Sequence, residues 1–151
     1  MAEFVVAHIL DDHQIGDRFT IWPLHVTILP PFDAPSIESV TGVVEAVALA
    51  AEPINLHVGD RAKFSSKTLV QKLIPSPELM SLHTKVLQAG EAEGWQITGR
   101  YIGKHYTPHI TERAGRSYID ATFILDSLSV VENIGQGYRV IRSEVVLGSR
   151  S

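Results

Sequence analysis

The chain has 151 residues, of which 44% are hydrophobic and 20% are charged, and its formal net charge is -4. This length supports one domain with its own core, here taken as residues 1–151, and is too short for two independent domains. The acidic balance argues against a protein that coats long nucleic acid by neutralising phosphates. Without cysteine there are no disulfides or thiolate metal sites, and we expect a cytoplasmic protein.

The N-terminal region predicts two strands joined by a polar loop. Residues 3–10 are apolar and β-branched and lack a basic start, which favours a buried strand over a secretion signal. Residues 11–19 are polar and predict the loop. Residues 20–29 alternate between apolar and polar side chains, and we expect this second strand to end at Pro30 and Pro31, because proline cannot continue a ladder.

Two helices and two further strands are predicted in the middle of the chain. An apolar stripe with helical spacing follows Ser36, and a second one follows Ser76 and Pro77, which suit a helix start. Gly94 suits the end of the second helix. The predicted helices are residues 36–51 and 77–93, and the predicted strands are residues 54–64 and 68–74.

The remaining apolar stretches predict three more strands, at residues 105–112, 121–132 and 138–147. Strands and helices in this irregular order indicate an α+β fold with antiparallel sheets. Each half of the chain carries one helix, several strands and at least one His-x-Thr sequence, which hints at an internal duplication. The order of the strands in the sheet is not predicted.

Two His-x-Thr sequences, 84 residues apart, stand out among the seven histidines. His25 and Thr27 form one pair, and His109 and Thr111 form the other. In a strand, residues i and i+2 point to the same face, so each imidazole is expected beside its hydroxyl while the neighbouring apolar residues face the core. Both motifs lie in predicted strands, and each has a proline within two residues upstream.

Such pairs suit phosphodiester chemistry. A hydroxyl and an imidazole N–H both donate hydrogen bonds to phosphate oxygens. In-line displacement needs a base on the attacking side and an acid on the leaving side, and histidine serves for both because its ordinary pKa is near neutrality. If the two pairs faced each other across a cleft, they would hold one phosphate from both sides. The alternative is two sheet histidines with only local hydrogen bonds.

The segments HVTILPPF and YTPHIT resemble the paired signatures of the two-histidine phosphoesterase superfamily, the 2'-5' RNA ligase-like proteins. The resemblance implies two lobes of antiparallel sheet with outer helices, related by a pseudo-two-fold axis, with a cleft between them. It also implies metal-independent chemistry without a cofactor, with His25 as the acid, His109 as the base, and Thr27 and Thr111 as phosphate holders. Members act on 2',3'-cyclic phosphates, 2'-5' linkages and related cyclic nucleotides.

One departure from the family pattern follows the second motif, where Glu112 stands before Arg113. Strand alternation predicts that Glu112 points away from the cleft and that Arg113 points into it, where it would bind phosphate. Other candidate substrate-binding residues are Tyr106 and Phe32, which flank the motifs and would stack on a base unless they pack in the core. His105 would line the cleft wall or be simply exposed.

The leading hypothesis is hydrolysis of a 2',3'-cyclic phosphate or a related nucleotide diester to a monoester. Reversible 2'-5' RNA ligation would use the same residues. A binding module that recognises a nucleotide or RNA end without turnover is a second class. A metal-dependent hydrolase using His105 and His109 is a third, although no metal site is expected. The expected partner is a mononucleotide or short RNA end rather than a duplex or a membrane, and we expect a monomer.

Overall fold

An antiparallel sheet and two helices form the protein, for which the computed structural model describes residues 2–113 and 115–148. The helices are α1 (Ile37–Leu49) and α2 (Pro77–Ala92), and a single 3-10 turn spans Gly103–His105. The strands are β1 (Ala2–Ile9), β2 (Arg18–Phe19), β3 (His25–Ala34), β4 (Ile54–Ser65), β5 (Thr68–Leu73), β6 (Gln96–Ile97), β7 (His109–Thr111), β8 (Thr122–Leu125), β9 (Ser127–Gly135) and β10 (Tyr138–Val146).

The strand order is β2-β10-β9-β1-β3-β7-β5-β4-β8, with β6 paired to β3. All the strand pairs of the described residues are antiparallel, which confirms the predicted α+β fold with an antiparallel sheet. The strands divide into one group around β1 and β3 and another around β5 and β4, joined through β3 and β7. That junction pairs one residue of each strand, Val26 with Ile110.

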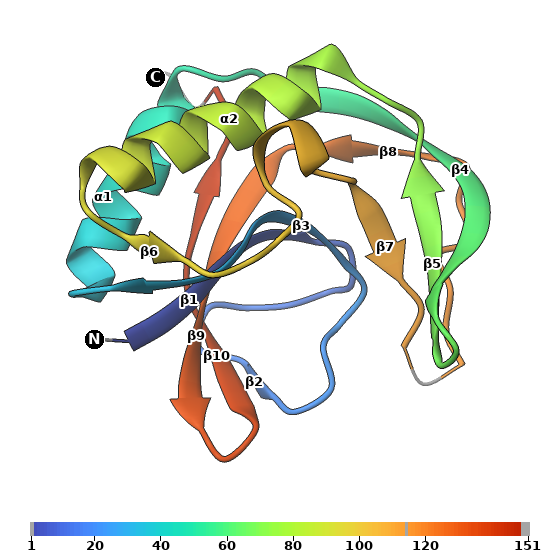
Figure 1. Ribbon diagram of the computed structural model, residues 1–151, viewed down its shortest axis with the longest axis horizontal. Helices are drawn as coiled ribbons and strands as arrows, with labels where there is room; N and C mark the ends of the chain where they lie inside the picture. The colour runs from blue at the N-terminus through green and yellow to red at the C-terminus, as the bar shows by residue number, and fades with distance from the viewer. Residues whose placement is uncertain (1, 114, 149–151) are drawn as a thin grey trace.

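Both helices pack side by side against one face of the sheet (Figure 1). Their predicted starts are confirmed, because Ser36 Oγ accepts from the amide of Ser39 at 3.1 Å and Ser76 Oγ from that of Leu79 at 3.2 Å. Each such cap contributes about 1 kcal/mol to helix stability.

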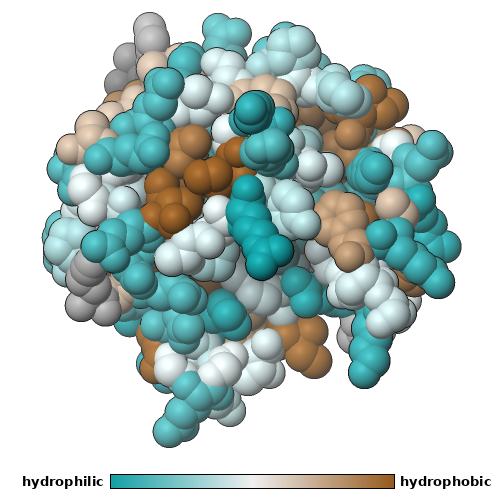
Figure 2. Space-filling view, in the orientation of Figure 1, coloured by the Kyte–Doolittle hydropathy of each residue, from teal (hydrophilic) through white to brown (hydrophobic). Residues whose placement is uncertain are grey.

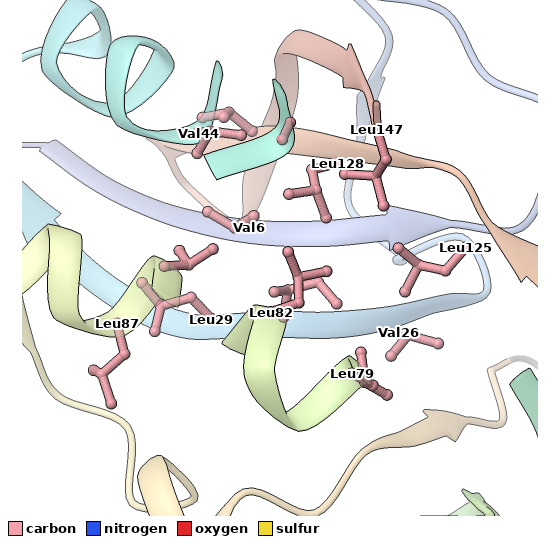
Figure 3. Close-up of a cluster of buried hydrophobic side chains, with 14 of the residues drawn as sticks. Val6, Val26, Leu29, Val44, Leu79, Leu82, Leu87, Leu125, Leu128 and Leu147 are labelled. Atoms are coloured by element: carbon pink, nitrogen blue, oxygen red, sulfur yellow. The ribbon is translucent and has the colours of Figure 1, made fainter. Parts of the chain in front are cut away.

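A single large core lies between the helices and the sheet (Figure 3). Its strand side includes Val6, Val26 and Leu29, and its helix side includes Val44 and Leu82. Burial of each such side chain stabilises the fold by roughly 1.5–3 kcal/mol. The junction residues belong to this core, so aliphatic packing holds the two groups of strands together at the point where they meet.

Strand β3 differs from its prediction at both ends. It begins at His25 rather than at residue 20, and it continues through Pro30 and Pro31 to Ala34. The prolines are tolerated because β3 has one more residue than β1 between Leu29 and Phe32, which is a β-bulge. An unpaired residue in a bulge needs no N–H donor, so the prediction that the ladder ends there is wrong.

The strand predicted at residues 105–112 is also shorter than expected. Only β7 is extended, and His105 ends the 3-10 turn. Pro108 has no N–H to donate, although its carbonyl accepts from Leu73 at 3.1 Å. The stretch predicted as 121–132 is two strands, β8 and β9, which meet at Asp126.

The face shown in Figure 2 carries small hydrophobic patches separated by hydrophilic residues. Scattered exposed apolar side chains of this kind are ordinary for a folded protein. Within the described residues, none of the helices has both the length and the apolar character needed to span a bilayer.

Candidate active site

Strands β3 and β7 bring the two His-x-Thr sequences together at the junction of the sheet. Val26 and Ile110 are paired and fully buried in the core. The residues on either side of them point to the opposite face, away from the helices. Because the strands are antiparallel, His25 lies beside Thr111 and His109 lies beside Thr27. The four side chains thus have a local pseudo-two-fold arrangement around one residue pair.

Both imidazoles are held by the main chain in the same way. His25 Nδ1 lies 2.8 Å from the carbonyl oxygen of Pro23, and His109 Nδ1 lies 2.7 Å from that of Thr107. A carbonyl oxygen only accepts, so each Nδ1 must carry a proton and donate. In the neutral ring, Nε2 is then the unprotonated nitrogen. The structure therefore fixes the same tautomer twice and leaves Nε2 as the nitrogen that can exchange a proton with a ligand.

His25 is the more buried of the two imidazoles, with 7% of its surface exposed. The Trp22 ring packs on it with a centroid separation of 4.2 Å. Burial lowers the pKa of His25 to about 4, with smaller lowering effects from the positive charges of Arg113 and His109, while the bond to Pro23 opposes the shift. Free His25 is therefore neutral at physiological pH.

His109 is partly exposed and has a different aromatic neighbour. The Phe64 ring, itself 40% exposed, lies 4.5 Å from the His109 ring between centroids. Burial lowers the pKa of His109, Arg113 lowers it further, and the hydrogen bond to Thr107 raises it. The largest shift is that of His25, so protonation costs more free energy at His25 than at His109.

The position of Arg113 agrees with its sequence prediction. Its charge acts on both imidazoles, and its Nε is buried without a hydrogen-bond partner among the described residues. Glu112 points away, as alternation predicts, and forms a two-point ion pair with Arg61, at 2.7 and 2.8 Å. Since buried polar groups are almost always satisfied, the unpaired Nε of Arg113 is an exception among the described residues.

Two of the predicted substrate contacts are wrong. Phe32 is fully buried, and it stacks on Trp95 with ring centroids 4.6 Å apart, so it packs in the core and cannot stack on a base. His105 was expected to face the same way as His109 in one strand, but it is an exposed residue of the 3-10 turn. This placement does not align the two histidines for a shared metal ion.

Tyr106 is buried beneath the motif of β3, so its ring is not available to stack on a base. Its hydroxyl donates to the carbonyl oxygen of Thr27 at 2.7 Å, and its ring stacks on His83 at 4.0 Å. His83 in turn accepts from the amide of Gly103 and bonds to the carbonyl of Ile28. This chain of contacts fixes the motif of β3 relative to the segment before β7.

A pocket lies on each side of the histidine pair. On the His25 side the walls include Trp22, Arg113 and the loop that contains Asp11 and Asp17. On the His109 side they include Thr27, Tyr101, Tyr106, Thr107 and His109, together with Pro30, Pro31, Gly99 and Arg100. A ligand with its phosphate between the imidazoles can therefore extend in two directions.

Asp11 and Arg116 join the two halves of the site. Arg116 donates to both carboxylate oxygens of Asp11, at 2.7 and 3.1 Å. The same carboxylate accepts from the amide of Leu24 at 2.8 Å, just before His25. Arg116 also exchanges two backbone hydrogen bonds with Arg113. The ion pair thus connects the segment before the first motif to the turn after the second.

Sequence reasoning did not identify Phe64, Tyr101, Asp11, Arg116 or Arg139 as site residues. Phe64 and Arg139 lie far along the chain from the rings that they adjoin, and Asp11, Tyr101 and Arg116 lie outside the predicted strands, so no local pattern reveals their places. Among the described residues, no cluster of three or more histidine, aspartate or glutamate side chains could hold a metal ion.

Comparison with known proteins gives a family and a fold. The family model of the 2'-5' RNA ligase superfamily matches residues 6–134. No curated protein matches the chain. Among solved structures, E. coli LigT complexed with NADP+ is 13% identical over 97% of each chain, with a TM-score of 0.63. TT0787 of Thermus thermophilus is 13% identical over 100% of each chain, also at 0.63. At these identities the structural likeness shows the fold alone.

Proposed function

Because the chain belongs to the 2'-5' RNA ligase superfamily, we propose that it is a phosphodiesterase that hydrolyses 2',3'-cyclic phosphates of nucleotides or short RNA ends to phosphomonoesters. The observation that carries this proposal is the pair of imidazoles with Nδ1 bonded to a carbonyl and Nε2 left for the ligand. Two threonine hydroxyls on the same sheet face and the nearby guanidinium of Arg113, whose buried Nε has no partner among the described residues, support an anion site.

The reaction needs no group beyond these side chains and water. One Nε2 takes a proton from the attacking water, and the other ring gives a proton to the departing sugar oxygen. Thr27, Thr111 and Arg113 donate to the non-bridging oxygens, where negative charge accumulates. Each acid or base role typically contributes roughly 10²–10⁴ to the rate.

The unequal burial of the rings favours one assignment of roles. Both pKa values are lowered, but protonation costs more at His25, so at neutral pH His25 is the ring held in the unprotonated form that a base needs, and His109 is the ring more readily protonated as the acid. This is the reverse of the assignment that the family resemblance implied. A bound phosphate raises the pKa of both imidazoles by its negative charge, which makes the protonated acid accessible in the complex.

Nucleotides are supported as the ligand class by the fold relatives and by the pocket. Solved structures of E. coli LigT include complexes with 3'-AMP and with ATP. In this chain the His109 pocket offers Tyr101, 58% exposed, and the nearby Phe64 ring as surfaces on which a base can stack.

The test is incubation of the protein with 2',3'-cyclic nucleotides and excess chelator, with product detected by chromatography. We expect turnover that the chelator leaves unchanged, and a loss of at least about a hundredfold in His25→Ala and His109→Ala. The substitution His57→Ala, at an exposed position on β4 outside the site, is the matched control. Near-normal activity in either site variant would contradict the acid-base pair.

The same assay separates the alternatives. A 2'-5' ligase would join a 2',3'-cyclic phosphate end to a 5'-hydroxyl end and would also cleave the 2'-5' dinucleotide. A binding module would show saturable binding without product. Activity that the chelator abolishes would indicate metal-dependent hydrolysis.

A further inference from the structure

Two of the arginines near His25 lack carboxylate partners among the described residues, as does the exposed Arg18, which lines the same pocket as Trp22. The first is Arg113, with its buried, unpaired Nε. The second is Arg139 on β10, whose guanidinium lies 5.7 Å from the centroid of the Trp22 ring. Two other arginines near the site are neutralised, Arg61 by Glu112 and Arg116 by Asp11.

The charges of Arg113 and Arg139 lie close enough to oppose each other. Burial, and then the charge of Arg139, lower the pKa of Arg113. Bringing like charges together without a counter-ion costs free energy. The cost is offset when an anion binds between them, so the cluster indicates a site that is completed by a ligand.

The phosphate held by the histidines does not account for Arg139. Arg113 acts on both imidazoles, whereas Arg139 is not among the charges that shift either of them. The Trp22 ring contacts both His25 and Arg139, so Arg139 lies one aromatic ring farther from the reaction centre. A second anionic group, displaced from the first, fits this position.

We propose that Arg139, Arg113 and Trp22 form a subsite for a second phosphate of the substrate, on the His25 side of the scissile group. The inference rests on the proposed function and narrows its substrate class. The preferred substrate is a cyclic phosphate whose nucleoside carries another phosphate, either a 5'-monophosphate or the internucleotide diester of an RNA end.

The loop beyond this subsite limits its size. Asp12 and Asp17 are exposed and line the pocket that Trp22 and Arg113 also line, and Asp11 is neutralised by Arg116. Free carboxylates at the outer wall repel further phosphates. The subsite is thus built for one extra phosphate and not for a long polyanion, in keeping with the net charge of the chain.

The test compares kcat/KM for adenosine 2',3'-cyclic phosphate and for its 5'-phosphorylated form. A dinucleotide with a cyclic phosphate end is assayed with a normal and with a neutral methylphosphonate linkage. We expect the second phosphate to raise kcat/KM by about ten- to a hundredfold, the range for hydrogen bonds to charged groups. Preference for the normal over the neutral dinucleotide assigns the role to the internucleotide diester, and a gain with the 5'-monophosphate alone assigns it to that group.

The ratio to follow is kcat/KM with the second phosphate divided by kcat/KM without it. Arg139→Gln should reduce this ratio to about one, and Arg139→Lys should restore part of it, because lysine retains the charge. Arg142→Gln is the matched control, since Arg142 lies on the same strand but pairs with Glu132, and it should leave the ratio unchanged. Thermal melting of all three variants checks that they fold. A ratio in Arg139→Gln equal to that of the wild type, or a ratio of about one in the wild type, would overturn the subsite.

Binding supplies an arm that does not depend on turnover. Calorimetry with adenosine 3',5'-bisphosphate and with 3'-AMP should show tighter binding of the bisphosphate, and Arg139→Gln should remove the difference. If the wild type cleaves no cyclic phosphate but shows this difference, the proposed function fails and the subsite stands. Equal binding of the two ligands rejects the subsite whatever the activity.

Discussion

The two motif strands reach the same imidazole geometry in different surroundings. In β3 the ring lies beneath Trp22 and is almost fully buried, whereas in β7 it lies beside the exposed Phe64 ring. The carbonyl two residues upstream fixes the tautomer in both. Repetition of the motif thus determines which nitrogen faces the ligand, and burial determines how readily that nitrogen is protonated. One sequence pattern can therefore supply two chemical roles.

The difference arises from the segments that flank the strands. The loop before β3 is held by Asp11, which bonds to the amide of Leu24 and to Arg116, and this keeps Trp22 over His25. The segment before β7 is a short 3-10 turn that places no comparable cover on His109. The segments before β3 and β7, which lie outside the motifs, therefore determine that His25 is buried and that His109 is partly exposed.

The strongest challenge to this comparison is a substrate that needs no acid. With a nucleoside phosphodiester that releases 4-nitrophenolate, the leaving group departs without a proton, and only the base remains necessary. We expect His109→Ala to recover most of the at least about hundredfold loss seen with a natural leaving group, while His25→Ala stays inactive. Steady-state kcat/KM for both substrates and both variants measures the difference.

Recovery by His25→Ala instead would reverse the assignment of acid and base. Loss of activity in both variants with both substrates would mean that the histidines act together in a way that the burial difference does not explain. Thr27→Ser, which keeps the hydroxyl, serves as the control for changes in packing along β3.

The second challenge is the pH dependence of stability. The pKa of His25 is lowered to about 4 in the folded protein, so its contribution is fully present above pH 6.5 and is lost as the pH falls towards 4. The loss amounts to roughly 3 kcal/mol of unfolding free energy. His25→Asn should remove this dependence, and His109→Asn should remove a smaller part. Urea unfolding between pH 4 and 7 measures it.

If the unfolding free energies of wild type and His25→Asn changed with pH in parallel, burial of His25 would not make its pKa different from that of His109. His13 acts in the opposite sense, because its hydrogen bond to the Asp11 carbonyl and its pairing with Glu144 raise its pKa despite burial. Its contribution is present at low pH and is lost as the pH rises through its folded pKa. The quantity to compare is therefore the difference in unfolding free energy between wild type and variant at each pH.

The smallest expected effect concerns Asp11, whose negative charge raises the pKa of His25. Asp11→Asn keeps an oxygen that can accept from Leu24 but removes the charge. NMR titration of the imidazole signals should then show a lower pKa for His25 and no change for His109. A shift of both, or of neither, would mean that the ion pair with Arg116 does not distinguish the two halves.

Much of the fold could be predicted from the sequence, because caps and apolar spacing act locally. Ser36 and Ser76 cap helices as expected, and β4 and β5 lie where alternation indicates. Two of the failures occur at prolines. Pro30 and Pro31 continue a strand because a bulge absorbs them, and Pro108 shortens β7. Whether proline ends a strand depends on a partner strand that the local sequence does not identify.

The site was predictable only in its local part. The common face of His25 and Thr27, and the opposite directions of Glu112 and Arg113, follow from strand alternation. Long-range packing decided the rest: Phe32 was a candidate for a base contact, but the neighbouring Trp95 and Phe4 enclose it. The roles assigned to the histidines and threonines stay predictions until the variants are assayed.

The carbonyl behind each imidazole has a consequence for the order of events in a cycle. In a serine protease a carboxylate stands in that position and stabilises the ring when it is charged. A carbonyl of Pro23 or Thr107 can accept a hydrogen bond but cannot take up a proton, so neither ring can pass its charge inward. Each histidine therefore carries one exchangeable proton, and the pair ends a turnover with its protons interchanged. In the proposed hydrolysis, exchange with solvent must therefore return both rings to their starting protonation states before the next substrate reacts.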